Sequence, residues 1–231
     1  MSITESVEQI QERIADACLR VGRKPDSVRL MAVSKMQPLP SIEAAWNAGV
    51  RLFGENRVQE ADEKFTLFKE QHPELELHLI GTLQRNKTNA ASMLFDCVQS
   101  VDREALIDKL GKACTSRPKP LPILLELHTG EDSKTGFPNI DGLCRAVERV
   151  LPYSSLVVQG LMTIAPNTED KARIRASFRS LISAYNILSS RFPSCDWSCL
   201  SMGMSSDFET AIEEGSTLIR IGTAIFGRRP A

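Results

Sequence analysis

Residues 28–56 read VRLMAVSKMQPLPSIEAAWNAGVRLFGEN, and this stretch indicates which fold to expect. An apolar run at Val28–Val33 leads into a helical segment at Ser41–Ala48, and a second apolar run follows at Arg51–Phe53. A strand, a helix and a second strand in this order form the unit from which parallel sheets are built. The rest of the chain repeats this unit.

Eight short apolar runs are expected to form strands. They are Val28–Val33, Arg51–Phe53, Leu75–Ile80, Asp96–Val101, Pro122–Leu127, Leu156–Met162, Cys199–Met202 and Leu218–Ile221. Segments of helical period or propensity lie between them, at Ser41–Ala48, Arg57–Gln71, Lys87–Met93, Arg103–Cys114, Ile140–Val150, Thr168–Arg191 and Ser206–Glu214. One more helix is predicted before the first strand, at residues 7–21, because its apolar residues share one helical face.

Strands with near-continuous apolar residues indicate a parallel sheet that is buried on both faces. A closed (β/α)₈ barrel (TIM barrel) and a doubly wound open sheet share this alternation, but eight units in roughly 200 residues favour the barrel. No linker, low-complexity segment or long charge run interrupts the chain, so one domain over residues 1–231 is expected. The predicted fold is therefore an α/β single barrel with an extra N-terminal helix.

The overall composition is that of an ordinary globular protein. Of the 231 residues, 42% are hydrophobic and 25% charged, and 28 basic against 29 acidic residues leave a net charge of −1. This balance gives no overall attraction to nucleic acid or membranes. No signal peptide or bilayer-spanning run is found, so a cytoplasmic protein is expected. The six cysteines form no Cys-x-x-Cys pair, and we expect reduced, mostly buried thiols and no metal site.

The polar residues of interest follow directly after predicted strands. In a (β/α)₈ barrel the C-terminal ends of the strands form one face, and the chemistry takes place there. The residues expected at this face are Ser34-Lys35, Gly54-Glu55-Asn56, Gly81-Thr82-Leu83-Gln84, Asp102, His128-Thr129, Thr163, Ser201-Met202-Gly203-Met204-Ser205 and Arg220-Ile221-Gly222-Thr223. Almost every unusual polar or glycine-rich cluster is therefore expected at one rim.

Lys35 comes at the end of the first strand. Most lysines at such positions simply reach solvent, and this is the plain alternative here. A lysine over a barrel mouth is instead partly desolvated, which makes its amine reactive toward aldehydes.

Two clusters of small and hydroxyl-bearing residues follow the last two strands, at residues 201–205 and 222–223. The loops after strands seven and eight are the customary phosphate site of this barrel, and backbone amides with hydroxyls can bind an anion there. The alternative for the first cluster is helix capping by Ser205 or Ser206 with Glu209 as the capping-box partner, and both can hold at once. Strand eight neighbours strand one in a closed barrel, so the phosphate site would lie beside Lys35. This combination fits pyridoxal 5′-phosphate, an aldehyde that carries a phosphate.

Several segments resemble the pyridoxal phosphate homeostasis protein family. They span residues 28–227 and include LMAVSKMQPLPSIEAAWNAGVRLFGENRVQEADEKF, HLIGTLQRNK, SVDR, EDSKTGF, GLMTIAP and LSMGMSSDFETAIEEGSTLIRIGTAIFG. The resemblance implies a barrel similar to the N-terminal domain of alanine racemase (type III fold), carrying pyridoxal phosphate with no established turnover. It also implies that Lys35 holds the cofactor as a Schiff base, Asn56 lies beside the ring and Arg220 faces the pyridine nitrogen. The phosphate region is expected at Ser201, Met202, Gly203, Ser205, Gly222 and Thr223.

Four further residues need an interpretation. His128 stands where the family more often has Asn, and Thr82 where it has a bulkier residue or Pro. Lys134 could be a second reactive lysine or a gatekeeper for phosphate, although a solvated loop lysine is the plainer interpretation. His78 is expected to be a hydrogen-bonded histidine inside the barrel rather than a catalytic base.

Two features argue against a racemase. A charged guanidinium at the ring nitrogen disfavours the pyridinium and so weakens the electron sink, although alanine racemase itself tolerates this arrangement. The opposing tyrosine of a racemase is also missing, because Tyr153 is expected at the opposite end of the barrel and Tyr185 in the middle of a helix outside it. No chain remains after residue 231 for a second domain. We therefore expect an open mouth and a monomer.

Three functions remain open. The favoured one is a non-catalytic carrier that holds intracellular pyridoxal 5′-phosphate and releases it to apo-enzymes, with salvage enzymes of the cofactor as further partners. The second is a weak pyridoxal phosphate-dependent amino-acid enzyme of the racemase type. The third is a sugar-phosphate barrel enzyme that uses Lys35 without the cofactor.

Overall fold

The computed structural model describes residues 1–130 and 135–227 and shows a closed barrel of parallel strands in sequence order. The sheet closes where β1 pairs with β8, from Arg29 opposite Leu218 to Ala32 opposite Ile221. The strands are β1 Arg29–Val33, β2 Leu52–Glu55, β3 Glu76–Leu79, β4 Cys97–Val101, β5 Leu121–Glu126, β6 Leu156–Met162, β7 Cys199–Ser201 and β8 Leu218–Ile221. The predicted (β/α)₈ barrel is confirmed.

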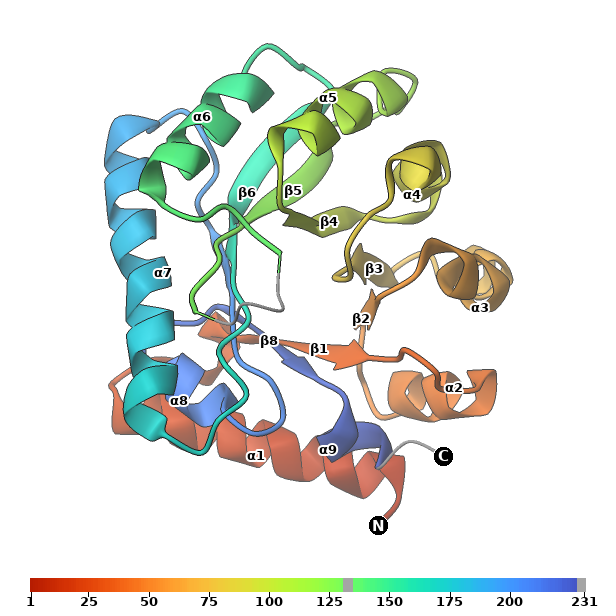
Figure 1. Ribbon diagram of the computed structural model, residues 1–231. Coiled ribbons are helices and arrows are strands. Elements are labelled where there is room, and N and C mark those ends of the chain that lie inside the picture. Colours follow the sequence, from red (N-terminus) through yellow and green to blue (C-terminus); the bar gives the residue numbers. More distant parts are fainter. Residues whose placement is uncertain (131–134, 228–231) are drawn as a thin grey trace.

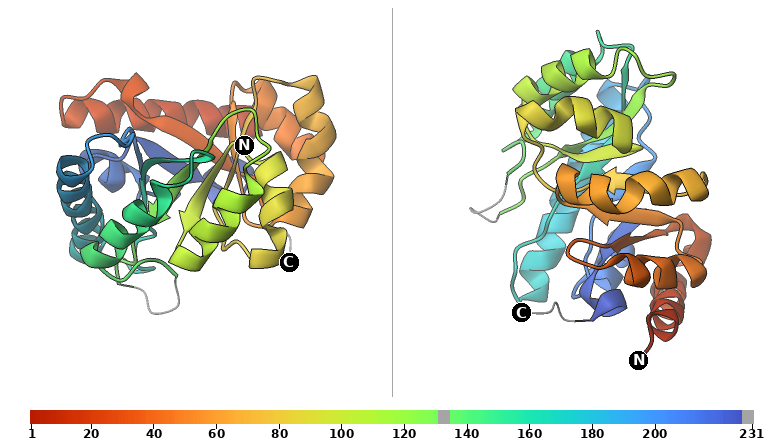
Figure 2. Two further views of the ribbon diagram at one scale, coloured as in Figure 1. Left: turned by 90° about the horizontal axis from the view of Figure 1, so that it is seen from above. Right: turned by 90° about the vertical axis from the view of Figure 1, so that its right-hand side faces the viewer.

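Helices surround the strands (Figure 1). The described α-helices are α1 Ile3–Arg20, α2 Leu39–Asn47, α3 Val58–Gln71, α4 Thr88–Leu94, α5 Glu104–Ala113, α6 Ile140–Val150, α7 Lys171–Arg191, α8 Phe208–Glu213 and α9 Thr223–Phe226. Helix α7 stands on the side opposite α3 and α4, with the strands between them (Figure 1 and the left view of Figure 2). Each helix is held by its apolar face: α5, for example, buries Leu106, Ile107 and Leu110 against the barrel.

The barrel interior is partly apolar and partly polar. Two small clusters of buried apolar side chains fill part of it, formed around Met31, Leu52 and Leu218, and around Cys97, Leu124 and Met162. Buried polar side chains occupy further interior positions, namely His78, Gln99, Ser201 and Arg220. A buried polar side chain needs a partner, and these four side chains are joined to one another by hydrogen bonds.

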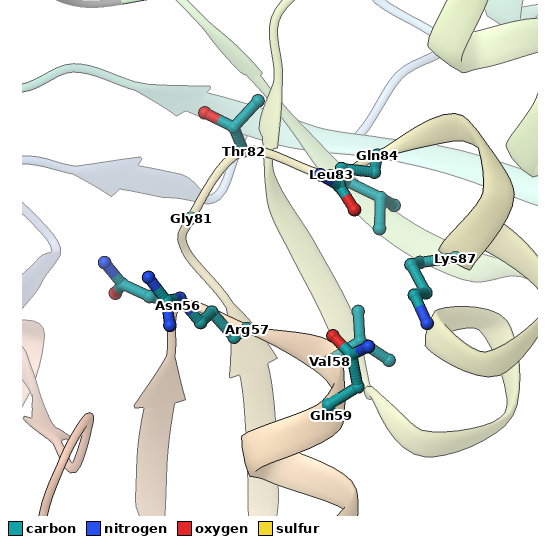
Figure 3. Close-up of a pocket in the computed structure, with 9 residues that line it drawn as sticks. All are labelled: Asn56, Arg57, Val58, Gln59, Gly81, Thr82, Leu83, Gln84 and Lys87. Carbon is teal, nitrogen blue, oxygen red and sulfur yellow. The ribbon is translucent and has the colours of Figure 1, made fainter.

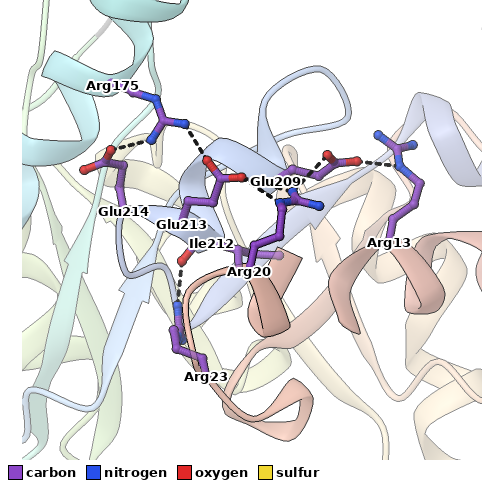
Figure 4. A network of polar contacts seen from close by, with 8 residues as sticks. All are labelled: Arg13, Arg20, Arg23, Arg175, Glu209, Ile212, Glu213 and Glu214. Carbon is purple, nitrogen blue, oxygen red and sulfur yellow. Dashed lines mark hydrogen bonds and ion pairs between the residues drawn. The ribbon is translucent and has the colours of Figure 1, made fainter. Parts of the chain in front are cut away.

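The short helix α8 is held between α1 and α7 (Figure 4). Glu209, the capping-box partner in the alternative interpretation of this segment, binds Arg13 at 2.7 Å and Arg20 at 3.3 Å. Glu213 binds Arg20 at 3.0 Å and also pairs with Arg175 of α7. These pairs are partly exposed and therefore screened by solvent, so their effect is mainly to orient α8.

The predicted helices are all found, but several ends differ. Helix α1 begins at Ile3 rather than at residue 7, because Ser2 and Glu5 form a capping box. Helix α7 begins at Lys171 rather than Thr168, because the Asp170 side chain accepts hydrogen bonds from the first amides of the helix.

Helix α8 begins at Phe208, so the predicted start at Ser206 is wrong, and the alternative of capping by Ser205 or Ser206 does not hold. Asp207 lies at the N-cap position, and its Oδ1 atom accepts a hydrogen bond from the Met204 amide at 2.6 Å. Helix α9 is not predicted, since four residues are too few to show a helical period.

In the described part of the chain, no helix is both long and apolar enough to cross a membrane. The six cysteines are free, and Cys18, Cys97, Cys114 and Cys144 are buried. The expectation of mostly buried thiols is confirmed.

Candidate functional site

The C-terminal ends of β7, β8, β1 and β2 lie next to one another around the barrel. The site residues expected from the sequence follow these four strands. Ser201, Met202, Gly203 and Ser205 come from the end of β7, Arg220, Gly222 and Thr223 from β8, Lys35 from β1 and Asn56 from β2. The structure thus brings all of them to one side of the same rim.

Lys35 lies in a tight turn just beyond the end of β1. The Gln37 amide donates a hydrogen bond to the Ser34 carbonyl at 3.0 Å, which closes the turn. Met36 has a φ of 60°, a left-handed conformation that costs energy in a residue with a side chain. Lys35 is half-buried and makes contacts of its own. The lysine is therefore held in a strained turn by its surroundings.

Three charged residues of β2 and α3 secure this turn. Lys64 donates to the Ser34 carbonyl at 2.9 Å and forms ion pairs with Glu55 at 2.6 Å and Glu60 at 2.9 Å. The Ser34 hydroxyl donates to Glu55 at 2.7 Å, and the Met36 amide donates to Glu60. Glu55 is fully buried, and burial raises the pKa of its carboxyl against the opposing effect of Lys64.

The loop after β7 depends on Gly203. Its φ is 97°, and a Cβ atom there would lie 2.6 Å from the Ala211 Cβ and 3.0 Å from the Phe208 Cα. Only glycine fits this position. The Gly203 carbonyl accepts a hydrogen bond from the Arg220 amide at 2.9 Å, so the loop is packed on α8 and joined to β8.

The loops after β7 and β8 present hydrogen-bond donors that the described chain does not use. The amides of Gly203, Ser205, Gly222 and Thr223 donate to no other described residue. The Ser205 hydroxyl accepts from the Ala224 amide at 3.3 Å, which joins the two loops. Thr223 is exposed, so its hydroxyl is accessible. Such donors on two adjoining loops form a site for an anion.

Arg220 lies inside the barrel near the end of β8 and is 4% exposed. Its Nη1 donates to the Ser201 hydroxyl and its Nη2 to the Thr163 carbonyl, each at 2.7 Å. Burial lowers the pKa of the guanidinium to about 10, and the carboxylates of Asp207 and Glu126 oppose this shift. Arg220 therefore keeps its charge at neutral pH.

The Ser201 hydroxyl bonds within the barrel interior. It accepts from Arg220 and donates to Gln99 Oε1 at 2.6 Å, so both of these hydrogen bonds lie within the barrel. Gln99 Nε2 lies 2.8 Å from His78 Nδ1. The prediction that His78 is a hydrogen-bonded interior histidine is confirmed, and burial lowers the pKa of its imidazole.

A cavity of about 450 Å³ lies beside Asn56, between the loops that follow β2 and β3 (Figure 3). Its lining residues are Asn56, Arg57, Val58, Gln59, Gly81, Thr82, Leu83, Gln84 and Lys87, and none of them carries a carboxylate. Lys87 points into the space from one side and Gln59 from the other (Figure 3). The cavity is thus a polar, positively charged recess that adjoins Asn56.

The other residues singled out in the sequence have varied placements. Thr82 is exposed, and His128 is half-buried with contacts of its own. Lys134 lies outside the described residues. Tyr153 precedes β6, at the end of the barrel opposite the rim, and Tyr185 lies in the middle of α7, as expected.

Sequence reasoning did not select Gln99, Glu60 or Lys64. Gln99 had a signal, because a carboxamide within the apolar run CVQSV must find a partner once it is buried. Glu60 and Lys64 are four residues apart on α3, a spacing typical of ordinary surface ion pairs. Only the fold shows that they reach the Lys35 turn.

The chemistry of the rim is that of an anion site beside a lysine and a buried cation. Among residues 1–130 and 135–227, no cluster of His, Cys, Asp or Glu could hold a metal ion. The donors of the two loops match a phosphate, and Lys35 matches an aldehyde. Fold and site together define a (β/α)₈ barrel with unused backbone donors on two adjoining loops beside a lysine at its mouth.

Comparison with known proteins agrees with this class. The family model of the alanine racemase N-terminal domain matches residues 6–230. PipY of Synechococcus elongatus, solved with pyridoxal phosphate bound, has a TM-score of 0.82 at 37% identity and covers 94% of this chain and 100% of its own. Alanine racemase from E. faecalis shares the fold, with a TM-score of 0.72 at 17% identity over 100% of this chain and 59% of its own.

Two curated relatives are similar over nearly their whole length. The pyridoxal phosphate homeostasis protein of Vibrio cholerae is 42% identical over 231 residues, 99% of this chain and 97% of the relative. That of Escherichia coli K12 is 39% identical over 232 residues, 98% of this chain and 97% of the relative. The chain belongs to the pyridoxal phosphate homeostasis protein family.

Proposed function

We propose that this protein binds pyridoxal 5′-phosphate at its C-terminal rim through a Schiff base to Lys35 and releases it to apo-enzymes, without catalysing a reaction of its own. The observation that carries this proposal is the order of groups around the rim. Free donors lie on the loops after β7 and β8, Lys35 follows β1 and Asn56 follows β2. The cofactor carries its phosphate arm and its aldehyde on adjacent ring atoms, which matches this order. The PipY structure with pyridoxal phosphate bound supports the proposal.

Each rim residue then has a distinct role. The amides of Gly203, Ser205, Gly222 and Thr223, with the Thr223 hydroxyl, hold the phosphate. Ser201 and Met202 supply the buried end of β7 behind this loop, and Ser201 also holds Arg220. Arg220 faces the ring nitrogen and Asn56 lies beside the ring. When bound, the cofactor supplies an aldehyde that an amine can capture reversibly.

The carrier proposal rests on what these residues do to the ring. Arg220 is charged at neutral pH, so it disfavours a proton on the ring nitrogen and keeps the ring a weak electron sink. Within the described residues, neither tyrosine lies at the rim to act as an opposing acid or base. The residues at the rim are thus better suited to holding the cofactor than to removing a proton from the α-carbon of an amino acid.

Two measurements test binding and release. Titration with pyridoxal phosphate should produce the visible absorbance of a protein-bound Schiff base. Loaded protein, mixed with an apo-enzyme and with a phosphatase that destroys free cofactor, should still activate the apo-enzyme. An unchanged spectrum would refute binding. Complete loss of activation in the presence of phosphatase would refute direct hand-over.

A weak amino-acid enzyme is the second candidate, and the cavity beside Asn56 favours it. The cavity presents Arg57 and Lys87 and no carboxylate, so it could take the carboxylate of an amino acid. The protein would then exchange the α-hydrogen of an amino acid in deuterium oxide faster than free cofactor does, and Lys35→Ala would lose this activity. Exchange at the rate of free cofactor would argue for the carrier.

A further inference from the structure

A row of hydrogen bonds crosses the barrel interior from Arg220 to His78. Arg220 Nη1 donates to Ser201 Oγ at 2.7 Å, Ser201 Oγ donates to Gln99 Oε1 at 2.6 Å, and Gln99 Nε2 lies 2.8 Å from His78 Nδ1. The four residues come from β8, β7, β4 and β3, and the Ser201–Gln99 hydrogen bond joins β7 to β4, which are not neighbours in the sheet. Gln99 and Ser201 are 0% exposed, and His78 and Arg220 are 4% exposed.

The Arg220 end fixes the direction of the row. A guanidinium has only donors, so Ser201 Oγ accepts a hydrogen bond from Arg220 and its own O–H donates one to Gln99 Oε1. Gln99 therefore turns its NH₂ group toward His78, whose Nδ1 must accept. The imidazole proton of His78 then lies on Nε2, which faces Glu76 Oε2 at 3.6 Å.

The row has a single consistent arrangement. Rotating the Gln99 amide would point its NH₂ group at Ser201 and would leave the Ser201 proton without its acceptor. In a buried row, such a mismatch costs the desolvation of an unpaired group. Burial also lowers the pKa of His78, which agrees with a neutral ring that accepts at Nδ1. The interior therefore holds the Arg220 guanidinium in one orientation.

We propose that Gln99 and His78 are positioning residues, which act through Ser201 to hold the Arg220 guanidinium fixed toward a ring bound at the rim. Neither residue needs to touch the cofactor. The proposal rests on the proposed function in one respect, that Arg220 faces the ring, whereas the direction of the row can be tested without any cofactor.

The first test is nitrogen NMR of the imidazoles in the protein without cofactor. The chain has three histidines, so a His78→Leu variant assigns the signals of His78. At neutral pH, His78 should be the neutral tautomer with its proton on Nε2 and a hydrogen bond accepted at Nδ1. A proton on Nδ1 would reverse the row and overturn the proposal.

The second test compares two substitutions in β4. Gln99→Met removes both hydrogen bonds of the row at similar side-chain volume, and it should weaken pyridoxal phosphate binding about tenfold. The matched control is Val98→Ala, the neighbouring residue, which packs in the core between strands and helices and does not touch the row. It should lower the melting temperature but leave the dissociation constant within about twofold.

Equal weakening by the two variants would reduce Gln99 to a structural residue, and unchanged binding in Gln99→Met would refute its role. If Gln99→Met does not fold, His78→Leu takes its place, with a weakening of about threefold expected and unchanged binding again a refutation. A parent protein that binds no pyridoxal phosphate would refute the proposed function instead, while the tautomer of His78 still decides the direction of the row.

Discussion

Arg220 is the single residue at which a carrier and an enzyme should differ most. It is enclosed by the barrel and held by Ser201 and Thr163, and burial lowers the pKa of its guanidinium only to about 10. A fixed positive charge at this position opposes protonation of a bound ring. The charge of residue 220 should therefore control how well the ring withdraws electrons.

Arg220→Glu should increase the exchange of amino-acid α-hydrogens for deuterium, because a carboxylate stabilises a protonated ring nitrogen. Arg220→Gln is the matched neutral variant and should give an intermediate rate. NMR of the amino acid in deuterium oxide measures both. Equally slow exchange by the parent, Arg220→Glu and Arg220→Gln would show that Arg220 does not act on the ring nitrogen. Rapid exchange by the parent protein would favour the enzyme.

Thr223 offers an exposed hydroxyl on the loop after β8. Thr223→Val should weaken pyridoxal phosphate binding about tenfold, because a hydrogen bond to a charged phosphate contributes roughly 1.5–3 kcal/mol and solvent reduces this at an exposed position. Fluorescence titration gives the dissociation constant. Thr115→Val, which lies before β5 at the other end of the barrel, is the control. Identical affinities in the two variants would place the phosphate elsewhere.

At the level of single elements, periodicity predicts the strands and the longer helices well. It fails at the ends and in short helices, where one side chain decides the outcome. Asp207 ends the loop before α8 by binding the Met204 amide, so neither preceding serine acts as the cap. A pattern of apolar residues does not contain this information, because several residues near a helix start have cap-forming side chains.

The contact between α3 and the turn that contains Lys35 is made by Lys64, which binds both the Ser34 carbonyl and Glu55. Lys64→Met should lower the free energy of unfolding by about 3 kcal/mol, because it leaves the buried Glu55 without its cation. The control on the same helix is Lys69→Met, which breaks the more exposed pair with Asp96 and should cost less than about 1 kcal/mol. Urea denaturation measures both, and equal losses would show that the Lys64 cluster is no more than a surface pair.

The decrease in the free energy of unfolding that Lys64→Met causes should depend on pH. Burial raises the pKa of Glu55 in the folded protein above its ordinary value of 4.5. The folded state thus favours the protonated acid of Glu55. The contribution of this one carboxyl to the free energy of unfolding is fully present below its unfolded pKa and is lost as the pH rises through its folded pKa. Lys64 lowers the pKa of Glu55, so Lys64→Met should raise this pKa further. The free energy of unfolding should then continue to fall up to a higher pH. A difference between variant and parent that is constant with pH would contradict this role of Glu55.

At the scale of the whole molecule, eight strand–helix units predict a closed barrel, and closure brings the ends of β7, β8, β1 and β2 together. The candidate rim residues could therefore be predicted from the sequence. The interior contacts could not, because they depend on the register of strands far apart in the chain. Ser201 and Gln99 are 102 residues apart, yet their side chains lie within 2.6 Å.

The attachment of the cofactor to Lys35 is the central claim, and covalent trapping tests it most directly. Protein loaded with pyridoxal phosphate is reduced with borohydride, digested, and analysed by mass spectrometry of the peptides. The cofactor should be found on the peptide that contains Lys35, and Lys35→Ala should lose this label while retaining weaker binding through the phosphate loops. A label on another lysine, with Lys134 the first to examine, or an undiminished label in Lys35→Ala would contradict the claim.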